Sequence, residues 1–475
     1  MAAMATSEQP TADIDQVQWQ ITPRHQVVLG WAGVAFAATA VAVTAIVTVT
    51  QRMFGAGTAG ASTCEFSETE VYCRMAGRAP ARSLTLWRPL SPLIARGVHA
   101  ITGWDLPHSF LVPAFIGFVL AIVGTALVAN ALADALDLTL AARRMLIVIA
   151  VSAWLVTPFA LRFWLFLPTM TDILGTGLCT LWLGLVLGRS RHAVWLAPVV
   201  AAAAVLNREV VLPFFLIAGA VVLVTRLRSW TLVVPSAAIV TLGFVLASVT
   251  DHDHPNPGIS GTLDSLKGSI LHPFALRSVV TLTIGFALIA LTPTALWRQG
   301  WRGPARTHLW VVAAAALGPF AVYLSDMQHD PRIASPATPL LCVVFACWIV
   351  SARRVTHIAL GTAAFAVWAV AWKVVVAAPP TPDGYVEFFR GRQQAGVVTA
   401  AVFGLLCLVA MVLDAKAIAD DRQATGGAVR RHAASRLRRG GEADEPGNAR
   451  CQTIRLPSSA SPETAGSQAM RAASP

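Results

Sequence analysis

The chain has 475 residues, of which 55% are hydrophobic and 13% are charged, and its mean hydropathy is +0.62. This composition excludes a soluble globular protein, and the length excludes a single membrane anchor, so we predict an all-α integral membrane protein with several spans. The formal net charge of +11 comes with arginines in short segments between apolar runs, not with a basic patch interleaved with aromatics. That pattern indicates membrane topology and argues against nucleic-acid binding.

Polar ends flank a long apolar region. Residues 1–25 lack a periodic apolar face and are expected to form a disordered cytoplasmic N-terminus. Residues 26–413 form the predicted transmembrane domain of about twelve helices. Their expected bounds are 27–50, 110–133, 145–160, 171–187, 193–206, 210–225, 231–249, 278–296, 309–324, 336–350, 358–376 and 396–413. Residues 414–475, rich in Ala, Gly, Ser and Pro with scattered Arg, predict a disordered basic cytoplasmic tail that contacts anionic membrane lipid.

The longest polar segment, 51–108, follows the first predicted span and should be the first extracytoplasmic loop. Loops of this length in a compact protein are usually functional. Glu68 and Glu70 lie in it, and a carboxylate can act as a general base if its surroundings tune its pKa; a solvated loop face is the alternative. Cys64 and Cys73 share the loop, so we predict a disulfide between them, with two free thiols as the alternative.

Arginines mark every second connection between the predicted spans, which places those connections in the cytoplasm. They are Arg143, Arg144, Arg189, Arg191, Arg226, Arg228, Arg298, Arg302, Arg306, Arg353 and Arg354. Both termini are then cytoplasmic, and the protein lies in the plasma (cell) membrane. The other connections face outward and hold most of the acidic, His and Asn residues. Within the first of them, residues 93–101 are apolar enough to form a short amphipathic helix along the interface.

The apolar run 193–225 is too long for one span of about 20 residues and is broken only by Asn207-Arg208-Glu209. Folded at this triplet, its first arm would cover only ~21 Å of a hydrocarbon core roughly 30 Å thick, so the tip is recessed in the outer half. Charges there need a wet cavity, a partner or surrounding protein. Asn207 suits the N-cap of the second arm, and Glu209 suits its dipole. Arg208 either binds a phosphate or pairs with Glu209.

Three further groups are predicted to face outward. Asp172, shortly after Arg162, stands where the fourth span begins, and it either caps that helix or faces a ligand or metal. Asp330-Pro331-Arg332 precedes the tenth span, where Arg332 suits a phosphate or an interfacial anchor. Asp251-His252-Asp253-His254 suggests a divalent metal, but its spacing matches no rigid site. We therefore predict no metal ligands and leave the cofactor open, with a divalent metal as the alternative.

Together these features resemble the superfamily of polyprenyl-phosphate-sugar-dependent glycosyltransferases with the GT-C fold, especially the multi-pass branch common in actinobacteria. The resemblance covers roughly residues 25–415. It rests on Glu68 or Glu70 ahead of Tyr72, Trp87-Arg88-Pro89-Leu90-Ser91-Pro92, Thr171-Asp172, Asn207-Arg208-Glu209 and Asp330-Pro331-Arg332. Members typically carry an Asp just after the first span, whereas the first acidic residue here is Glu65.

The resemblance implies transfer of a sugar from a polyprenyl-phosphate carrier to an acceptor at the extracytoplasmic face. Glu68 or Glu70 would be the base, and Asp172 would orient the acceptor or a metal. The candidate substrate-binding residues are Arg88, Arg162, Asn207, Arg208, Glu209, Asp330 and Arg332, with Arg208 and Arg332 as phosphate ligands. One alternative is a transporter or flippase for a lipid-linked or anionic solute, which needs polar residues near the bilayer midplane. Another is a membrane protein without catalysis.

Overall fold

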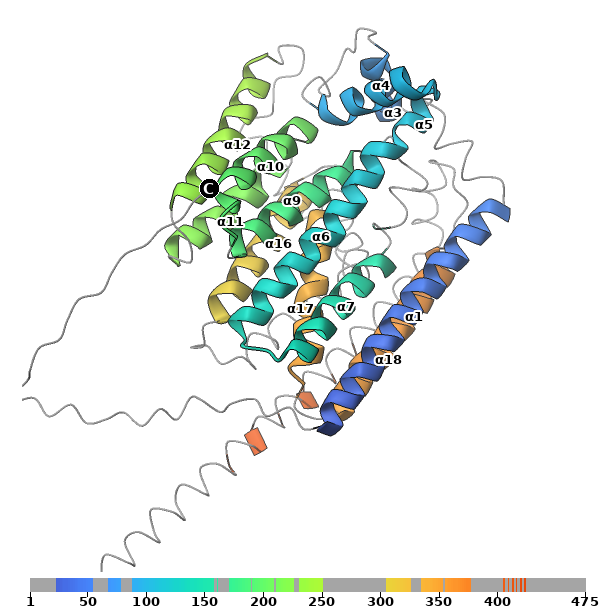
Figure 1. Ribbon diagram of the computed structural model, residues 1–475, viewed down its shortest axis with the longest axis vertical. Coiled ribbons are helices and arrows are strands. Elements are labelled where there is room, and N and C mark those ends of the chain that lie inside the picture. Colours follow the sequence, from blue (N-terminus) through green and yellow to red (C-terminus); the bar gives the residue numbers. More distant parts are fainter. Residues whose placement is uncertain are drawn as a thin grey trace, which may run out of the picture. The chain divides into compact units, whose positions relative to one another are not determined.

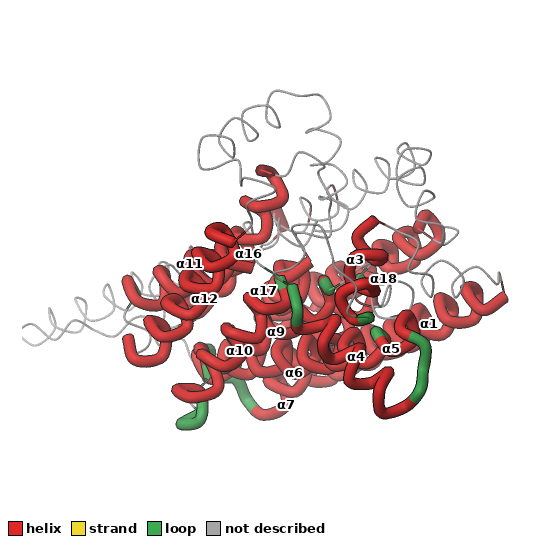
Figure 2. The backbone as a smooth tube through the Cα atoms, turned by 90° about the horizontal axis from the view of Figure 1, so that it is seen from above, coloured by secondary structure: helices red, strands yellow, loops and turns green. Residues whose placement is uncertain are grey.

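A computed structural model shows the helices of the chain (Figure 1). It describes residues 23–53, 67–77, 88–157, 160, 171–188, 190–208, 211–225, 230–250, 305–325, 335–352, 355–376 and scattered positions between 405 and 423. The chain divides into two units, Met1–Ile418 and Ala419–Pro475, and every helix named below belongs to the first. All regular elements in the described ranges are helical (Figure 2), which confirms the predicted all-α fold.

Ten of the predicted spans correspond to helices whose ends lie within a few residues of the expected bounds. They are α1 (Pro23–Met53), α6 (Leu111–Ala135), α7 (Leu140–Val156), α9 (Asp172–Leu187), α10 (Ala193–Asn207), α11 (Leu212–Val224), α12 (Trp230–Thr250), α16 (Ala305–Ser325), α17 (Thr338–Val350) and α18 (Val355–Val376). The predicted span 278–296 and most of 396–413 lie outside the described residues, so the count of about twelve stays a prediction. The predicted first loop contributes α3 (Ser67–Ala76), α4 (Leu90–Thr102) and α5 (Leu106–Ser109).

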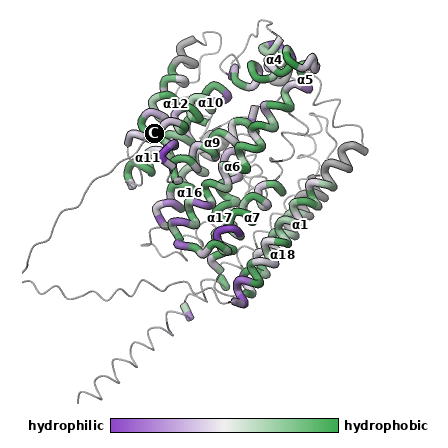
Figure 3. Tube along the Cα trace, viewed as in Figure 1, coloured by the Kyte–Doolittle hydropathy of each residue, from purple (hydrophilic) through white to green (hydrophobic). Residues whose placement is uncertain are grey.

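The helices have the apolar character that a bilayer requires. Among the described residues, Pro23–Ala45 and Leu106–Ala135 are long and apolar enough to cross a membrane, and five further apolar helices are shorter. Figure 3 shows hydrophobic residues along the bodies of the helices and hydrophilic residues mostly near their ends. With the composition of the whole chain, these helices identify an all-α membrane protein.

Two helices, α6 and α9, pack backbone against backbone in the core (Figure 1). A Cβ added to Gly177 of α9 would lie 2.3 Å from the carbonyl oxygen of Gly117 in α6. About two turns further along α6, a Cβ on Gly124 would lie 2.5 Å from the backbone nitrogen of Leu181 in α9. Small residues permit this close approach, which is common between membrane helices. The contact fixes where α9 begins relative to α6.

The first-loop helices lie at one end of this core, which we call the α4 end. There α4 contacts α6 and α10, and a small apolar cluster formed by Tyr72, Cys73, Ala76, Ala95 and Phe110 joins α3 to α4 and α6. Since Ser91 and Thr171 both hydrogen-bond Asn207, α9 begins and α10 ends at this same end.

The connection between α6 and α7 lies at the opposite end. There Arg143 forms an ion pair with Asp134 and also donates a hydrogen bond of 3.4 Å to Asn130. The first loop and this arginine-bearing connection are therefore separated by the length of α6. Which end faces the cytoplasm stays a prediction.

Candidate site at the start of α9 and the end of α10

The candidate site is formed where α10 ends beside the start of α9. Asp172 is the first residue of α9, where the helix dipole favours a negative charge. Arg208 follows the last residue of α10 in an extended conformation (φ −163°, ψ 123°), which turns the chain out of the helix. Its Nη1 forms an ion pair with Oδ1 of Asp172, and the two side chains are 9% and 2% exposed, respectively. The pair is therefore enclosed by protein.

The sequence predicts that charges at this recessed turn need a wet cavity, a partner or surrounding protein, and this ion pair supplies a partner. An isolated charge in a low-dielectric surrounding is strongly disfavoured, whereas two opposite charges in contact neutralise each other. Arg208 obtains both a partner and surrounding protein, and the partner comes from 36 residues earlier in the chain. Glu209, the partner that the sequence suggests, lies outside the described residues, so that local pair stays untested.

Asn207 lies beside the ion pair and is fully buried. Its Nδ2 donates a hydrogen bond of 2.8 Å to the carbonyl oxygen of Thr171, and its Oδ1 accepts one of 2.8 Å from the hydroxyl of Ser91. A Cβ added at Gly175 would lie 3.2 Å from that Nδ2, so the glycine leaves room for the amide. One side chain thus joins α4, α9 and α10.

Both predicted caps are wrong. Asn207 is the last residue of α10 and does not cap the next helix, because α11 begins only at Leu212. Asp172 does not cap α9 either, because the cap position belongs to Thr171, which makes no side-chain capping bond. In each case the side chain reaches a neighbouring helix. The Asp172 carboxylate is held by Arg208, and its role toward a ligand or a metal stays a prediction.

A second polar contact extends the site toward α17. The Thr176 hydroxyl, one turn beyond Asp172 on α9, lies 3.0 Å from the hydroxyl of Ser335, and both residues are buried. Ser335 in turn accepts a hydrogen bond of 2.7 Å at its carbonyl oxygen from the Thr338 hydroxyl. The segment that enters α17 is therefore anchored on α9 next to the ion pair.

The first loop holds the remaining described candidates. Glu70 lies on α3 and pairs with Arg74 one turn later at 2.5 Å; the Glu70 side chain is 43% exposed, as the solvated-face alternative expects. Glu68 belongs to the same helix. Arg88 lies two residues before α4 and donates a hydrogen bond of 2.7 Å to the Tyr72 hydroxyl on α3, so this bond links α3 to the start of α4.

Cys73, on α3, is disulfide-bonded. Its predicted partner Cys64 lies outside the described residues, so the pairing stays a prediction.

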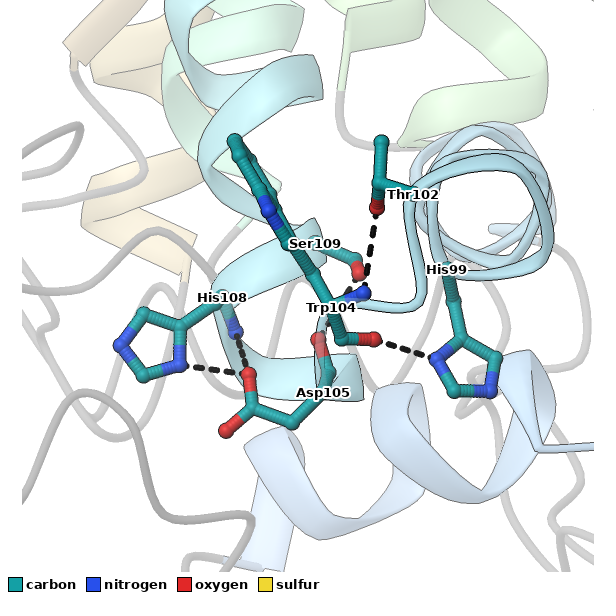
Figure 4. A network of polar contacts seen from close by, with 6 residues as sticks. All are labelled: His99, Thr102, Trp104, Asp105, His108 and Ser109. Atoms are coloured by element: carbon teal, nitrogen blue, oxygen red, sulfur yellow. Dashed lines mark hydrogen bonds and ion pairs between the residues drawn. The ribbon is translucent and has the colours of Figure 1, made fainter.

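The turn between α4 and α5 is held by exposed polar contacts (Figure 4). Asp105 caps α5 by accepting a hydrogen bond of 3.1 Å from the backbone N–H of His108, whose ring Nδ1 also lies 2.5 Å from the carboxylate. The ring of His99 contacts the carbonyl oxygen of Trp104 at 2.5 Å, and the Thr102 hydroxyl accepts from the Trp104 N–H at 3.2 Å. These bonds hold the turn that joins α4 to α5, and we assign them no chemistry.

Several predicted residues lie outside the described ranges. They are Arg162, Glu209, Asp330, Arg332 and the segment 251–254. Within the described part of the chain, no three His, Cys, Asp or Glu side chains gather in a way that could hold a metal ion. The sequence does not predict Ser91 as a site residue, because it stands in the Trp87–Pro92 segment that carries the resemblance but nothing in the sequence indicates a partner for its hydroxyl. Its role appears only from its contact with Asn207, 116 residues later.

No protein-family model matches the sequence, and no curated protein matches it. Two solved structures are similar in part: ArnT from Cupriavidus metallidurans bound to undecaprenyl phosphate, at 16% sequence identity, and the same protein in the apo state, at 17%. Each comparison covers 80% of this chain and 76% of the other, with a TM-score of 0.41. At this identity and score, the likeness carries no argument about the activity of this chain.

Proposed function

We propose that the chain is a GT-C-like membrane glycosyltransferase, which transfers a sugar from a polyprenyl-phosphate carrier to an acceptor at the extracytoplasmic face. The observation that supports this most is the buried Asp172–Arg208 ion pair at the α4 end. Asp172, Asn207 and Arg208 stand out separately in the sequence, and they meet in space beside α4, a helix of the predicted first loop. A shared location is what a common substrate site requires.

Arg208 is the proposed ligand of the carrier phosphate. A guanidinium offers planar, bidentate hydrogen bonding that matches phosphate oxygens, and its charge persists at all physiological pH values. Asp172 holds this guanidinium in a fixed position inside the protein, so little ordering remains for the substrate to impose. Arg332 is the proposed second phosphate ligand. Ser335, three residues after it, is anchored on α9 one turn from Asp172, which supports that assignment.

The proposed base is Glu68 or Glu70 on α3. This helix is joined to the start of α4 by the Arg88–Tyr72 hydrogen bond, and α4 reaches the ion pair through Ser91 and Asn207. The carboxylates and the phosphate ligand therefore belong to connected elements. In this proposal α3 supplies the group that takes the proton of an acceptor hydroxyl as the hydroxyl oxygen bonds to the anomeric carbon of the sugar; the bond from that carbon to the phosphate oxygen breaks, and polyprenyl phosphate leaves.

The test is transfer of labelled sugar from a polyprenyl-phosphate donor by the purified protein. We expect the parent to release the label to an acceptor, and Arg208→Ala to lower the rate at least about tenfold, since charge-assisted bonds to phosphate are the strong ones. Among Glu68→Gln and Glu70→Gln, the variant that removes the base should lose the most activity. Equal turnover in the parent and all three variants contradicts the proposal.

A matched control is Asp134→Asn, which breaks the other described Asp–Arg ion pair. That pair lies at the end of α6 remote from α4, so its loss should leave the transfer rate within about twofold. The control separates a specific role of Arg208 from a general effect of removing an ion pair.

A further inference from the structure

The last residue of α10 and the residue that follows it contact two consecutive residues at the start of α9. The Asn207 amide donates to the carbonyl oxygen of Thr171, and Arg208 pairs with Asp172. Because each contact uses adjacent backbone positions, a displacement of Asn207 carries Arg208 with it. The Asn207 side-chain amide therefore helps to set the position of the Asp172–Arg208 ion pair.

The Asn207 amide also accepts a hydrogen bond from α4, a helix of the predicted first loop. Ser91 is the second residue of α4, and its hydroxyl donates to Oδ1 of Asn207. Ser91, Pro92 and Ala95 are the buried residues of α4, whereas Leu93 and Ile101 are 56% and 86% exposed. Small side chains make up this buried face, so the Ser91 hydroxyl is the directional contact between α4 and the site.

We propose that Asn207 is a positioning residue that couples the placement of α4 to the geometry of the Asp172–Arg208 pair. Rotation of the amide away from either partner leaves buried polar groups unpaired, which disfavours such rotation. A shift of α4 is therefore passed to the start of α9 and the end of α10. What the pair binds rests on the proposed function, whereas the coupling itself rests on these contacts alone.

In terms of the reaction, this coupling links the two halves of the site. The proposed base lies on α3, and the proposed phosphate ligand follows α10. An acceptor that moves the first loop would change the position of Arg208, and a phosphate on Arg208 would favour one position of α4. By linkage, each ligand then changes the affinity for the other by the same factor.

The first test needs no activity. Hydrogen–deuterium exchange is compared in the parent, Ser91→Ala, Ser91→Thr and Ser109→Ala. Alanine favours helix, so α4 is expected to form in Ser91→Ala. We expect faster exchange in the first turn of α9 and the last turn of α10 in Ser91→Ala, with partial recovery in Ser91→Thr, which keeps the hydroxyl.

Ser109→Ala is the matched control. Ser109 is also buried and belongs to α5, but its hydroxyl bonds within its own turn, to the carbonyl oxygen of Asp105. Exchange at α9 should therefore stay unchanged in this variant. If Ser91→Ala behaves like Ser109→Ala at α9 and α10, the coupling is refuted.

The second test measures the affinity for undecaprenyl phosphate in the parent, Ser91→Ala, Asp172→Asn and the double variant. Ser91 does not contact the ion pair in the described contacts, so independent effects would multiply to within about twofold. We expect the double variant to depart from that product by at least about threefold. A simple product refutes the coupling. If the parent does not bind the phosphate while exchange changes as expected, the proposed function fails and the positioning role of Asn207 stands.

Discussion

Arg208, which directly follows α10, forms a buried ion pair with Asp172, the first residue of α9. The two side chains belong to the ends of neighbouring helices, so the pair fixes these ends against each other. It also neutralises two charges that a membrane protein cannot leave alone in its interior. The stability of the helix packing and the proposed phosphate site therefore depend on the same two residues.

The pair has a direct consequence for stability. Asp172→Asn removes the carboxylate charge that Asp172 supplies to the buried guanidinium of Arg208 and should cost about 3–5 kcal/mol in the free energy of unfolding. A double variant, Asp172→Asn with Arg208→Met, should recover part of that loss because the buried positive charge is removed as well. Thermal unfolding in detergent measures both. Asp134→Asn is the control, since its pair with Arg143 is about a third exposed and should contribute about 1 kcal/mol or less. Equal melting temperatures for Asp172→Asn and Asp134→Asn would contradict this account.

The close contact of α6 and α9 gives a second prediction. In Gly177→Ala the new Cβ would meet the backbone carbonyl of Gly117, which cannot rotate away, so the two helices must separate. We expect a loss of about 1–3 kcal/mol, as for other overpacked cores. Gly30→Ala is the control, because a Cβ at Gly30 of α1 meets nothing within 4 Å. The measurement is the melting temperature of each variant in detergent. A Gly177→Ala variant as stable as Gly30→Ala would show that the contact between α6 and α9 at Gly177 is not tight.

The sequence predicts the helices well because apolar runs and polar breaks mark their bounds. The bounds of α9 and α10 fall within one residue of the expected ones. The partners of the polar residues were harder to predict. Glu209 is the neighbour of Arg208 in the sequence, but Asp172 is its partner in space, and only the packing of α9 beside α10 brings them together. The sequence likewise predicts that Asn207 caps the helix that follows it, because its partners are distant in the sequence. In the structure its side chain bonds to Ser91 of α4 and to Thr171 at the start of α9.

The predicted topology can be tested by labelling. Cysteine is introduced in Gly97→Cys on α4 and in Arg191→Cys, at an exposed position between α9 and α10. Because arginine-rich connections stay in the cytoplasm, a membrane-impermeant maleimide should label position 97 in intact cells and position 191 only after permeabilisation. The parent measures background from native cysteines, of which Cys179, Cys342 and Cys347 are buried. The reverse labelling pattern would invert the orientation and move the site to the cytoplasmic side.

The disulfide at Cys73 yields a prediction about its partner. Because Cys64 is predicted to share the loop, a non-reduced digest analysed by mass spectrometry should contain a peptide in which Cys64 is linked to Cys73. The linked peptide should disappear after reduction and in Cys64→Ser. A digest in which Cys73 is linked to another cysteine would show that the predicted pairing is wrong.

The proposed transfer of sugar is tested most directly by following a doubly labelled donor, with one label on the sugar and one on the polyprenyl phosphate, in sealed proteoliposomes. This measurement also separates an enzyme from a transporter or flippase. The account predicts that the sugar label passes to an acceptor while the lipid label stays in the bilayer, and that Arg208→Ala abolishes most of the transfer whereas Asp134→Asn does not. An intact donor, whether moved across the bilayer or left in place, would contradict the account.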